Sequence, residues 1–229
     1  LAGVWQEDDV NAPFVDANGQ TNGKTNGEVY KVKPGNSKYV DVNKDGVYND
    51  ADQGIIGCGQ PTFNWGWNNT FNYKNFDFSF FVVGFHGFDI YNATHQMGYN
   101  LIKSQQMAGV TPMRELLNRW TPTNTNTDIP GFVKGGTENK DFFSTRFVEN
   151  GSFIKMKSIT LGYTLPEATC RSLGINNLRV YASVQNPFHI TKYSGLDPEA
   201  TMGSPLVQGV DWGAYPNSRN YLIGLNFSF

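Results

Sequence analysis

The chain has 229 residues, of which 17% are charged and 14% aromatic, and its net charge at pH 7 is −2. This near-neutral charge provides no basic surface for nucleic acid, and the longest apolar run, 80–85, is far shorter than the ~18 residues of a membrane helix. A polar average, with a mean hydropathy of −0.43, together with many aromatic residues is typical of a transmembrane β-barrel, where apolar and polar residues alternate, or of a sugar-binding β-sandwich.

The first strand signal stands at the start of the chain. No signal peptide precedes it, which suggests a fragment or a processed piece. GVWQ, residues 3–6, is interpreted as the end of a strand.

Residues 41–52, DVNKDGVYNDAD, have the spacing of a calcium-binding loop. Such a loop supplies oxygen ligands from positions 1, 3, 5, 7, 9 and 12, with glycine at position 6 where the chain turns sharply. The predicted ligands are Asp41, Asn43, Asp45, the Val47 carbonyl, Asn49 and Asp52. Position 12 is aspartate instead of glutamate and no helix pair flanks the loop, so we expect a structural Ca²⁺ site. The alternative is a solvated turn whose Asp and Asn side chains cap their own backbone.

Strong alternation begins at Thr62. In TFNWGWNNTFNY, 62–73, the apolar residues from Phe63 to Tyr73 share one face, and polar residues or glycine occupy the other. Lys74-Asn75 is a tight turn, and FDFSFFVVGF, 76–85, continues the pattern. Only a period of two produces it, so we predict a β-hairpin with one strongly apolar face.

Short helices are predicted in the long connection 86–151. They lie at 92–107 and at 111–120, the second with Thr111 as N-cap and Pro112 at its first position. Residues 121–131 are a turn-rich loop.

Three further strands follow at 152–165, 178–186 and 220–229. Each predicted strand has about the ~9–11 residues that a tilted strand needs to cross a bilayer. In the hairpin, Phe63, Trp65 and Trp67 gather at one end and Phe71, Tyr73 and Phe76 at the other, as in the aromatic girdles of membrane barrels. In a β-sandwich, the alternative fold, they would spread along a buried face.

The connections alternate between short and long. Lys74-Asn75 and 166–177 are short, whereas 7–61, 86–151 and 187–218 are long. Outer-membrane barrels have short periplasmic turns and long extracellular loops, so we expect the C-terminus and the short connections on the periplasmic side. Cys58 and Cys170 then lie on opposite sides of the membrane, which excludes a disulfide between them.

The strands are too few to close a barrel. Five complete strands, or six with GVWQ, fall below the ~8 of the smallest barrels. The chain is therefore expected to be the C-terminal part of a larger all-β barrel, with long extracellular loops.

Several long phrases resemble a known family. PGNSKYVDVNKDGVYNDADQG, RFVENGSFIKMKSITLGYTLP, LRVYASVQNPFHITKYSGLDPE and YLIGLNFSF, in this order, resemble the C-terminal third or quarter of SusC/RagA-type TonB-dependent outer-membrane transporters of Bacteroidetes. The resemblance implies that residues 1–229 are the C-terminal antiparallel strands of a large plugged barrel, with loop 41–52 inside an extracellular loop.

The resemblance also implies a function and partners. It implies import of oligosaccharides or peptides across the outer membrane of a Gram-negative cell, with a SusD-like surface lipoprotein as a lid. Energy would come from TonB through an N-terminal part that has no counterpart in this chain.

The last strand resembles the terminal signal that the barrel-assembly machinery reads. Its residues are Tyr221, Ile223, Leu225, Phe227 and Phe229. An edge strand with an apolar stripe offers a template for strand pairing. The alternative is an ordinary final strand.

Residues 204–220 contain the candidate solute contacts. Trp212, Tyr215 and Asn217 suit stacking on a sugar and hydrogen bonding to it, and the alternative is packing on neighbouring loops or on the lipoprotein. The residues expected to line the channel or to pair with the plug are Asn68, Asn72, Asp77, Arg179 and Gln185.

No catalytic pattern is found in the sequence. His86, His95 and His189 have no acidic or cysteine partner at a ligand spacing, and Glu149 and Glu167 are expected on opposite sides of the membrane, where they cannot pair as glycosidase acids. We therefore predict a segment of an uptake barrel and not an enzyme. The alternative function is a secreted, calcium-stabilised β-sandwich that binds carbohydrate.

Overall fold

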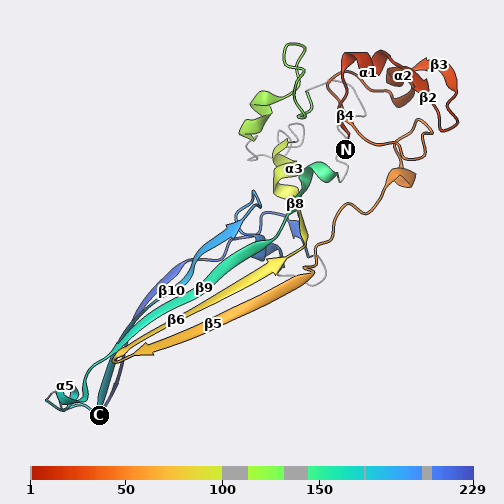
Figure 1. The fold of residues 1–229 in the computed structure, drawn as a ribbon. Coiled ribbons are helices and arrows are strands. Elements are labelled where there is room, and N and C mark those ends of the chain that lie inside the picture. The colour runs from red at the N-terminus through yellow and green to blue at the C-terminus, as the bar shows by residue number, and fades with distance from the viewer. Residues whose placement is uncertain (1, 100–112, 132–143, 173, 203–207) are drawn as a thin grey trace. The chain divides into compact units, whose positions relative to one another are not determined.

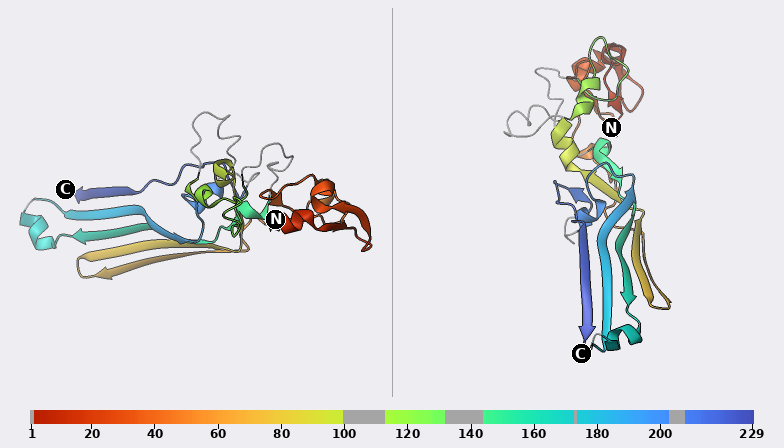
Figure 2. Two further views of the ribbon diagram at one scale, coloured as in Figure 1. Left: turned by 90° about the horizontal axis from the view of Figure 1, so that it is seen from above. Right: turned by 90° about the vertical axis from the view of Figure 1, so that its left-hand side faces the viewer.

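The computed structural model describes residues 2–99, 113–131, 144–172, 174–202 and 208–229. The chain forms two compact units. We call Gly57–Asn92 with Glu149–Phe229 the sheet unit, and Leu1–Ile56 with Ala93–Val148 the loop unit. Figures 1 and 2 show their elements as ribbons.

Five long antiparallel strands make up most of the sheet unit. They are β5 (Phe63–Tyr73), β6 (Phe76–His86), β9 (Phe153–Thr164), β10 (Asn177–Thr191) and β12 (Asn220–Ser228). Their order is β12-β10-β9-β6-β5, so each long strand pairs with the next one along the chain. All five strands were predicted, and β10 continues to Thr191 instead of ending at 186.

The short connections lie at one end of this sheet. Lys74, with a φ of +53°, turns the chain between β5 and β6, and α5 (Glu167–Ser172) connects β9 to β10. Phe76 pairs with Tyr163, and Asn177 pairs with Ser228, so the C-terminal end of β12 is at the same end (Figure 1). The predicted alternation of connections is confirmed. In the described part of the chain, the edge strands β5 and β12 each have one strand partner.

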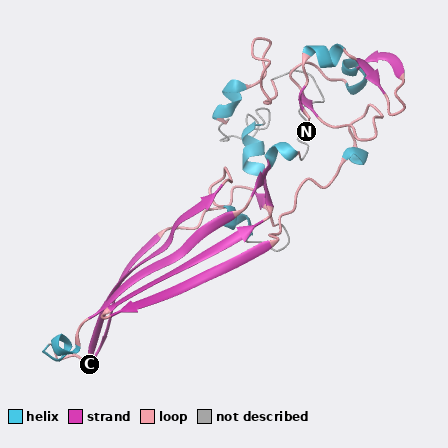
Figure 3. Ribbon diagram, in the orientation of Figure 1, coloured by secondary structure: helices cyan, strands magenta, loops and turns pink. Residues whose placement is uncertain are grey.

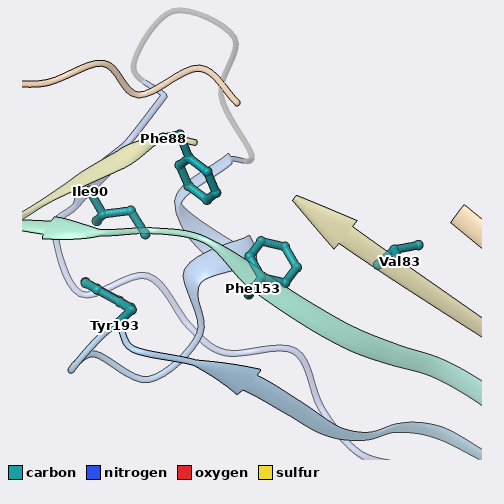
Figure 4. Packing of buried hydrophobic residues seen from close by; sticks show 5 residues of the cluster. All are labelled: Val83, Phe88, Ile90, Phe153 and Tyr193. Atoms are coloured by element: carbon teal, nitrogen blue, oxygen red, sulfur yellow. The ribbon is translucent and has the colours of Figure 1, made fainter. Parts of the chain in front are cut away.

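A small second layer covers the other end of the sheet. It contains β7 (Asp89–Asn92), β8 (Val148–Asn150) and β11 (Val210–Asp211), in the order β11-β7-β8, and the short helix η4 (Pro198–Met202). The buried side chains that join this layer to the sheet are Val83, Phe88, Ile90, Phe153 and Tyr193 (Figure 4). The run 80–85 is apolar on both faces because Val83 and Phe85 pack into this cluster.

The loop unit is built from short elements, which Figure 3 distinguishes by colour. They are β1 (Gly3–Val4), α1 (Glu7–Asn11), β2 (Pro13–Val15), β3 (Thr21–Thr25), α2 (Asn26–Tyr30), β4 (Ser37–Lys38), η1 (Asp50–Asp52), α3 (Ala93–Tyr99), η2 (Arg114–Asn118) and η3 (Thr145–Phe147). Trp5, Val10 and Val32 form its core.

One local prediction needs correction, and two helix predictions are observed in part. GVWQ is not a sixth strand of the large sheet, because Gly3 and Val4 pair with Lys38 and Ser37 in a separate two-stranded sheet. Of the helix predicted at 92–107, residues 93–99 are observed as α3 and residues 100–107 lie outside the described residues, as do Thr111 and Pro112. Around 114–118 the chain forms a 3₁₀ helix.

Cys58 is an exposed free thiol and Cys170 a buried one. Among the described residues, no helix is both long and apolar enough to cross a membrane.

Candidate functional site

One face of the five-stranded sheet is apolar from edge to edge. Phe71 pairs with Phe78, Phe78 with Leu161, Leu161 with Ala182, and Ala182 with Ile223. Directly paired residues lie on the same face of an antiparallel sheet, so these side chains form one continuous row. The buried cluster of the sheet unit involves Val83 and Phe153, which lie on the opposite face.

Most large side chains of the apolar face are exposed to solvent. Of the side chains that would be buried in a sandwich, the exposed ones are Phe71, Phe78, Leu161, Val180 and Leu225. Trp65 is half-buried because its ring covers Gly84, where a Cβ would lie 2.3 Å from Trp65 Cε2. Trp65 Nε1 also donates to His86 Nε2 at 3.1 Å.

The opposite face carries mostly uncharged polar groups. The paired sets on this face are Asn68–Phe81–Ser158–Gln185–Asn220, Thr70–Ser79–Thr160–Ser183–Leu222 and Asn72–Asp77–Gly162–Tyr181–Gly224. The predicted channel residues Asn68, Asn72, Asp77, Arg179 and Gln185 all lie on this polar face. They form a wall of hydrogen-bonding groups whose single acid, Asp77, is paired.

Asp77 on β6 and Arg179 on β10 meet above the strand between them. Arg179 Nε donates to Asp77 Oδ1 at 2.8 Å and Arg179 Nη2 donates to Asp77 Oδ2 at 2.5 Å. The two side chains cross β9 at Gly162, which has no side chain to obstruct them. The Arg179 guanidinium also lies over the Tyr181 ring, 5.0 Å from its centroid.

Replacing Gly162 by alanine is expected to separate this ion pair. A Cβ at Gly162 would lie 2.3 Å from Asp77 Oδ1 and 2.6 Å from Arg179 Nη2. We expect a loss of about 1–3 kcal/mol in the free energy of unfolding, as for other overpacked sites, measured by denaturant titration. Gly66→Ala is the control on the same face, where the nearest atom, in Phe81, is 3.3 Å away. Equal losses in both variants would contradict this reading.

A buried ionic cluster joins β9 to the chain after β10. Lys155 is 2% exposed, and its Nζ lies 2.7 Å from Asp197 Oδ2 and 2.8 Å from Glu199 Oε2. Lys157 also pairs with Glu199. Because Lys155 pairs with Val83 in the sheet, it lies on the polar face. Sequence reasoning missed this cluster.

The hydrogen bonds of the cluster keep both acids ionised. Burial acts to raise the pKa of Asp197, but the hydrogen bonds from Lys155 and from the Asn217 backbone outweigh it, and the pKa is lowered. Burial of Glu199 is likewise outweighed by its bonds to Lys155 and Lys157, so that its pKa is also lowered.

The predicted contact residues lie together in sequence but differ in role. Trp212 is 59% exposed and Tyr215 90% exposed. Asn217 instead uses its side chain within the protein: Nδ2 donates to Asp197 Oδ2 at 3.2 Å and to Glu199 Oε2 at 2.9 Å. Asn217 is thus bound to the ionic cluster.

Loop 41–52 is held by its own side-chain oxygens. Asp41 Oδ2 accepts from Gly46 N at 2.9 Å, Asn43 Oδ1 from Asp45 N at 3.1 Å, and Asp45 Oδ1 from Val47 N at 2.8 Å. The far end of the loop closes on Asp52, which accepts from Val42 N and Asn49 N. Gly46 has a φ of +82° and packs against Val29.

One oxygen of this loop is buried without a partner. Asp41 Oδ1 has no hydrogen bond in the described part of the chain, whereas Asp41 Oδ2 also accepts from the Tyr30 hydroxyl at 2.9 Å. Burial and this bond raise the pKa of Tyr30. Nowhere in the described ranges do three His, Cys, Asp or Glu side chains converge as a metal site. The side-chain oxygens of Asn43, Asp45 and Asn49 accept from backbone amides of the same loop, as in a self-capped turn, and Asp41 Oδ1 is the buried oxygen that this arrangement leaves over.

The terminal strand β12 exposes the predicted stripe. The exposed side chains are Tyr221, Ile223, Leu225, Phe227 and Phe229. Along one edge β12 pairs with β10 from Asn177↔Ser228 to Gln185↔Asn220, so its apolar stripe continues the apolar face of the sheet.

The chain is similar to several named proteins. TonB-dependent receptor P3 of Formosa agariphila is 36% identical over 202 residues, which cover 86% of this chain and 19% of that protein. TonB-dependent receptor SusC of Bacteroides thetaiotaomicron is 32% identical over 199 residues, covering 86% of this chain and 18% of SusC. The chain spans about a fifth of the length of these curated relatives. No protein-family model matches it.

Solved structures give the same correspondence. The chain aligns with a structure of the RagAB peptide transporter at 29% identity and a TM-score of 0.62, over 75% of this chain and 17% of that chain. It aligns with the RagAB peptide importer in the closed-closed state at 27% identity and a TM-score of 0.65, over 94% of this chain and 20% of that chain.

Proposed function

Since this chain belongs to the SusC/RagA type of TonB-dependent receptor, we propose that it forms part of the wall of an outer-membrane barrel that imports nutrients. The observation that carries the proposal is the five-stranded antiparallel sheet with a bare apolar face and a polar opposite face. A membrane barrel turns the first face to lipid and the second to its interior. In a secreted sandwich the apolar face would be covered.

The proposed solutes are oligosaccharides or peptides. SusC and RagAB are the named relatives, and RagAB is described as a peptide importer. The polar face, whose charged residues Asp77 and Arg179 are paired with each other, supports a solute that is bound by hydrogen bonds. We further propose a SusD-like lipoprotein partner and energy from TonB, both by analogy with these relatives.

Deletion of the receptor that contains this chain tests the proposal. The host should lose uptake of a radiolabelled glycan hydrolysate or of a radiolabelled peptide digest, and inactivation of TonB should abolish the same uptake. A tagged receptor should copurify with a surface lipoprotein. Unchanged uptake of both probes in the deletion strain would refute the proposal.

The last strand is proposed to be the assembly signal for insertion. Its exposed stripe, from Tyr221 to Phe229, supports this role, because the free edge of β12 can pair with another strand. The barrel-assembly machinery would be the partner.

Loop 41–52 is proposed to bind a structural Ca²⁺. The proposal rests on the ligand spacing and on the unpartnered oxygen Asp41 Oδ1. Asp41 Oδ1 would coordinate the calcium ion, which would strengthen a loop already attached to α2 through the hydrogen bond from the Tyr30 hydroxyl to Asp41.

Calcium binding is expected to depend on Asp41. The protein should bind Ca²⁺ with a dissociation constant on the order of 10⁻⁴ to 10⁻³ M, the range of extracellular sites, and Asp41→Asn should abolish binding. Calorimetry measures the affinity, and terbium luminescence sensitised by the stacked Tyr30 and Tyr48 reports the location. Asp50→Asn, outside the ligand set, is the control and should bind normally. Equal affinities in both variants would rule out the loop as the site.

A further inference from the structure

We infer that residues Asp211–Asn217, which we call the aromatic stretch, form a rigid contact surface for the transported solute through Trp212 and Tyr215. Lys155, Asp197, Glu199 and Asn217 are positioning residues for this surface. The inference rests on the proposed uptake function and assigns a task to the ionic cluster within it.

The first end of the aromatic stretch is fixed to the sheet through β7. Asp211 pairs with Asn92 in the parallel β11–β7 ladder, and β7 follows directly on β6. The carboxylate of Asp211 is buried: Oδ2 accepts from the Tyr193 hydroxyl at 2.5 Å, and Oδ1 accepts from Gly213 N and Ala214 N at 2.8 and 3.0 Å. Asp211 therefore sets the direction in which the chain leaves β11.

A close backbone contact reinforces this end. Gly209 has a φ of +76°, and a Cβ on it would lie 2.6 Å from Gly59 Cα and 2.7 Å from the Asp89 carbonyl oxygen. Tyr91 N donates to the Gly209 carbonyl at 2.7 Å. Such a contact leaves little freedom for the chain that enters the aromatic stretch.

The second end is fixed to β9 through the ionic cluster. Asn217 N donates to Asp197 Oδ2 at 3.1 Å, and Asn217 Nδ2 reaches both Asp197 and Glu199. These two acids are bound by Lys155, which is buried near the start of β9. A buried charge pair is weak evidence for stability but can specify one conformation, and here it fixes the end of the aromatic stretch.

Between the two fixed ends, the large side chains remain outside. Tyr215 is 90% exposed and Trp212 59% exposed. Tyr and Trp offer a large contact area at a low cost in conformational entropy, and a contact surface that is already ordered binds more tightly because less freedom is lost on binding. A rigid stretch with two exposed aromatic side chains therefore suits recognition.

The anchors favour a solute as the ligand over a protein lid. Lys155, Val83 and Phe153 lie on the polar face of the sheet, the face that a barrel turns inward. The aromatic stretch is thus attached to the interior side of the wall. In the ionic cluster, Lys155 and Lys157 are paired with Asp197 and Glu199. The cluster therefore offers no unpaired charge to a ligand, and the exposed aromatic rings of the stretch are the contacts that remain.

The experiment uses the full-length receptor and the labelled glycan hydrolysate and peptide digest. For the probe that the wild type takes up, Trp212→Ala and Tyr215→Ala are each expected to raise the probe concentration that gives half-maximal uptake by about tenfold, as for other aromatic contact residues. Ile55→Ala, at a side chain that is 99% exposed, is the control and should change nothing. If the wild type takes up neither probe, the proposed function is refuted. If both aromatic variants reach half-maximal uptake at the wild-type probe concentration, this inference alone is overturned.

Asn217→Ala separates positioning from contact. Asn217 is exposed, so the variant should fold, and loss of its bonds should loosen the aromatic stretch. We expect the probe concentration at half-maximal uptake to rise. We also expect chymotrypsin to cleave after Trp212 about tenfold faster, because cleavage follows local opening of the chain. Tyr215→Ala should raise the probe concentration at half-maximal uptake without accelerating cleavage. Unchanged cleavage in Asn217→Ala would remove the positioning role, and loss of lipoprotein copurification with normal uptake in Tyr215→Ala would assign the stretch to the lid.

Discussion

Replacing Leu161 by arginine is expected to keep the receptor out of the outer membrane. Leu161 lies on the central strand β9 of the apolar face, paired with Phe78 and Ala182, towards the end of the sheet with the short connections, and is 51% exposed. If this face meets lipid, arginine there costs up to about 2–4 kcal/mol, enough to impair insertion or to lower the folded fraction severely. The amount of heat-modifiable receptor in outer-membrane fractions measures the effect.

Thr70→Arg is the matched control. Thr70 is exposed as well, but it lies on the polar face, opposite Ser79. An arginine there meets the interior of the barrel, so we expect insertion near the wild-type level. If both variants insert equally, the apolar face does not meet lipid, and the barrel interpretation of this sheet is wrong.

Replacing Lys155 by methionine is expected to destabilise the sheet unit by about 3–5 kcal/mol, because it leaves Asp197 buried without its cation and leaves Glu199 with Lys157 alone. Denaturant titration of the receptor in lipid vesicles measures the loss. The double variant Lys155→Met, Asp197→Asn removes the buried pair, keeps the side-chain volumes and leaves Glu199 paired with Lys157. It should recover most of the stability, since neutral replacements of buried ion pairs are often tolerated.

The Lys155→Met effect should depend on pH. In the wild type the pKa values of Asp197 and Glu199 are lowered from 3.8 and 4.5. The stability they contribute is complete above those ordinary values and is lost as the pH falls through the lowered values. In the variant, burial acts to raise the pKa of Asp197 without the opposing bond from Lys155. The difference in stability between wild type and Lys155→Met should therefore be largest near neutral pH and should narrow as the pH falls. If the two free energies of unfolding differ by the same amount at every pH, then lost packing, and not lost charge, explains the destabilisation.

The long strands could be predicted because their pattern is local. The alternation from Phe63 to Tyr73 requires only a period of two, and the two-residue turn at Lys74 sets the hairpin register. The placement of both short connections and the C-terminus at one end of the sheet followed from the connection lengths. The sixth strand was predicted wrongly because Gly3 and Val4 give too short a pattern to distinguish a barrel strand from a local pairing with Ser37.

The ionic cluster could not be predicted because its partners are far apart in sequence. Lys155 lies 42 residues from Asp197, and a lysine that alternates with apolar residues is equally compatible with an exposed position. Asn217 was assigned to the solute for the same reason, since nothing nearby in sequence indicates that its amide is already used. The one available signal was the run 80–85, whose apolar residues on both faces indicate that this end of the sheet is covered.

The two free edges of the sheet have a practical consequence for the protein in the laboratory. Within the described ranges, strands β5 and β12 each have one strand partner, so the other edge of each offers backbone donors and acceptors beside exposed aromatic side chains. Such an edge is the template for edge-to-edge polymerisation. Produced alone in aqueous buffer, the 229-residue chain should collect in inclusion bodies and refold into fibrils or oligomers. Biochemical work on any of its residues is therefore best done within the complete receptor.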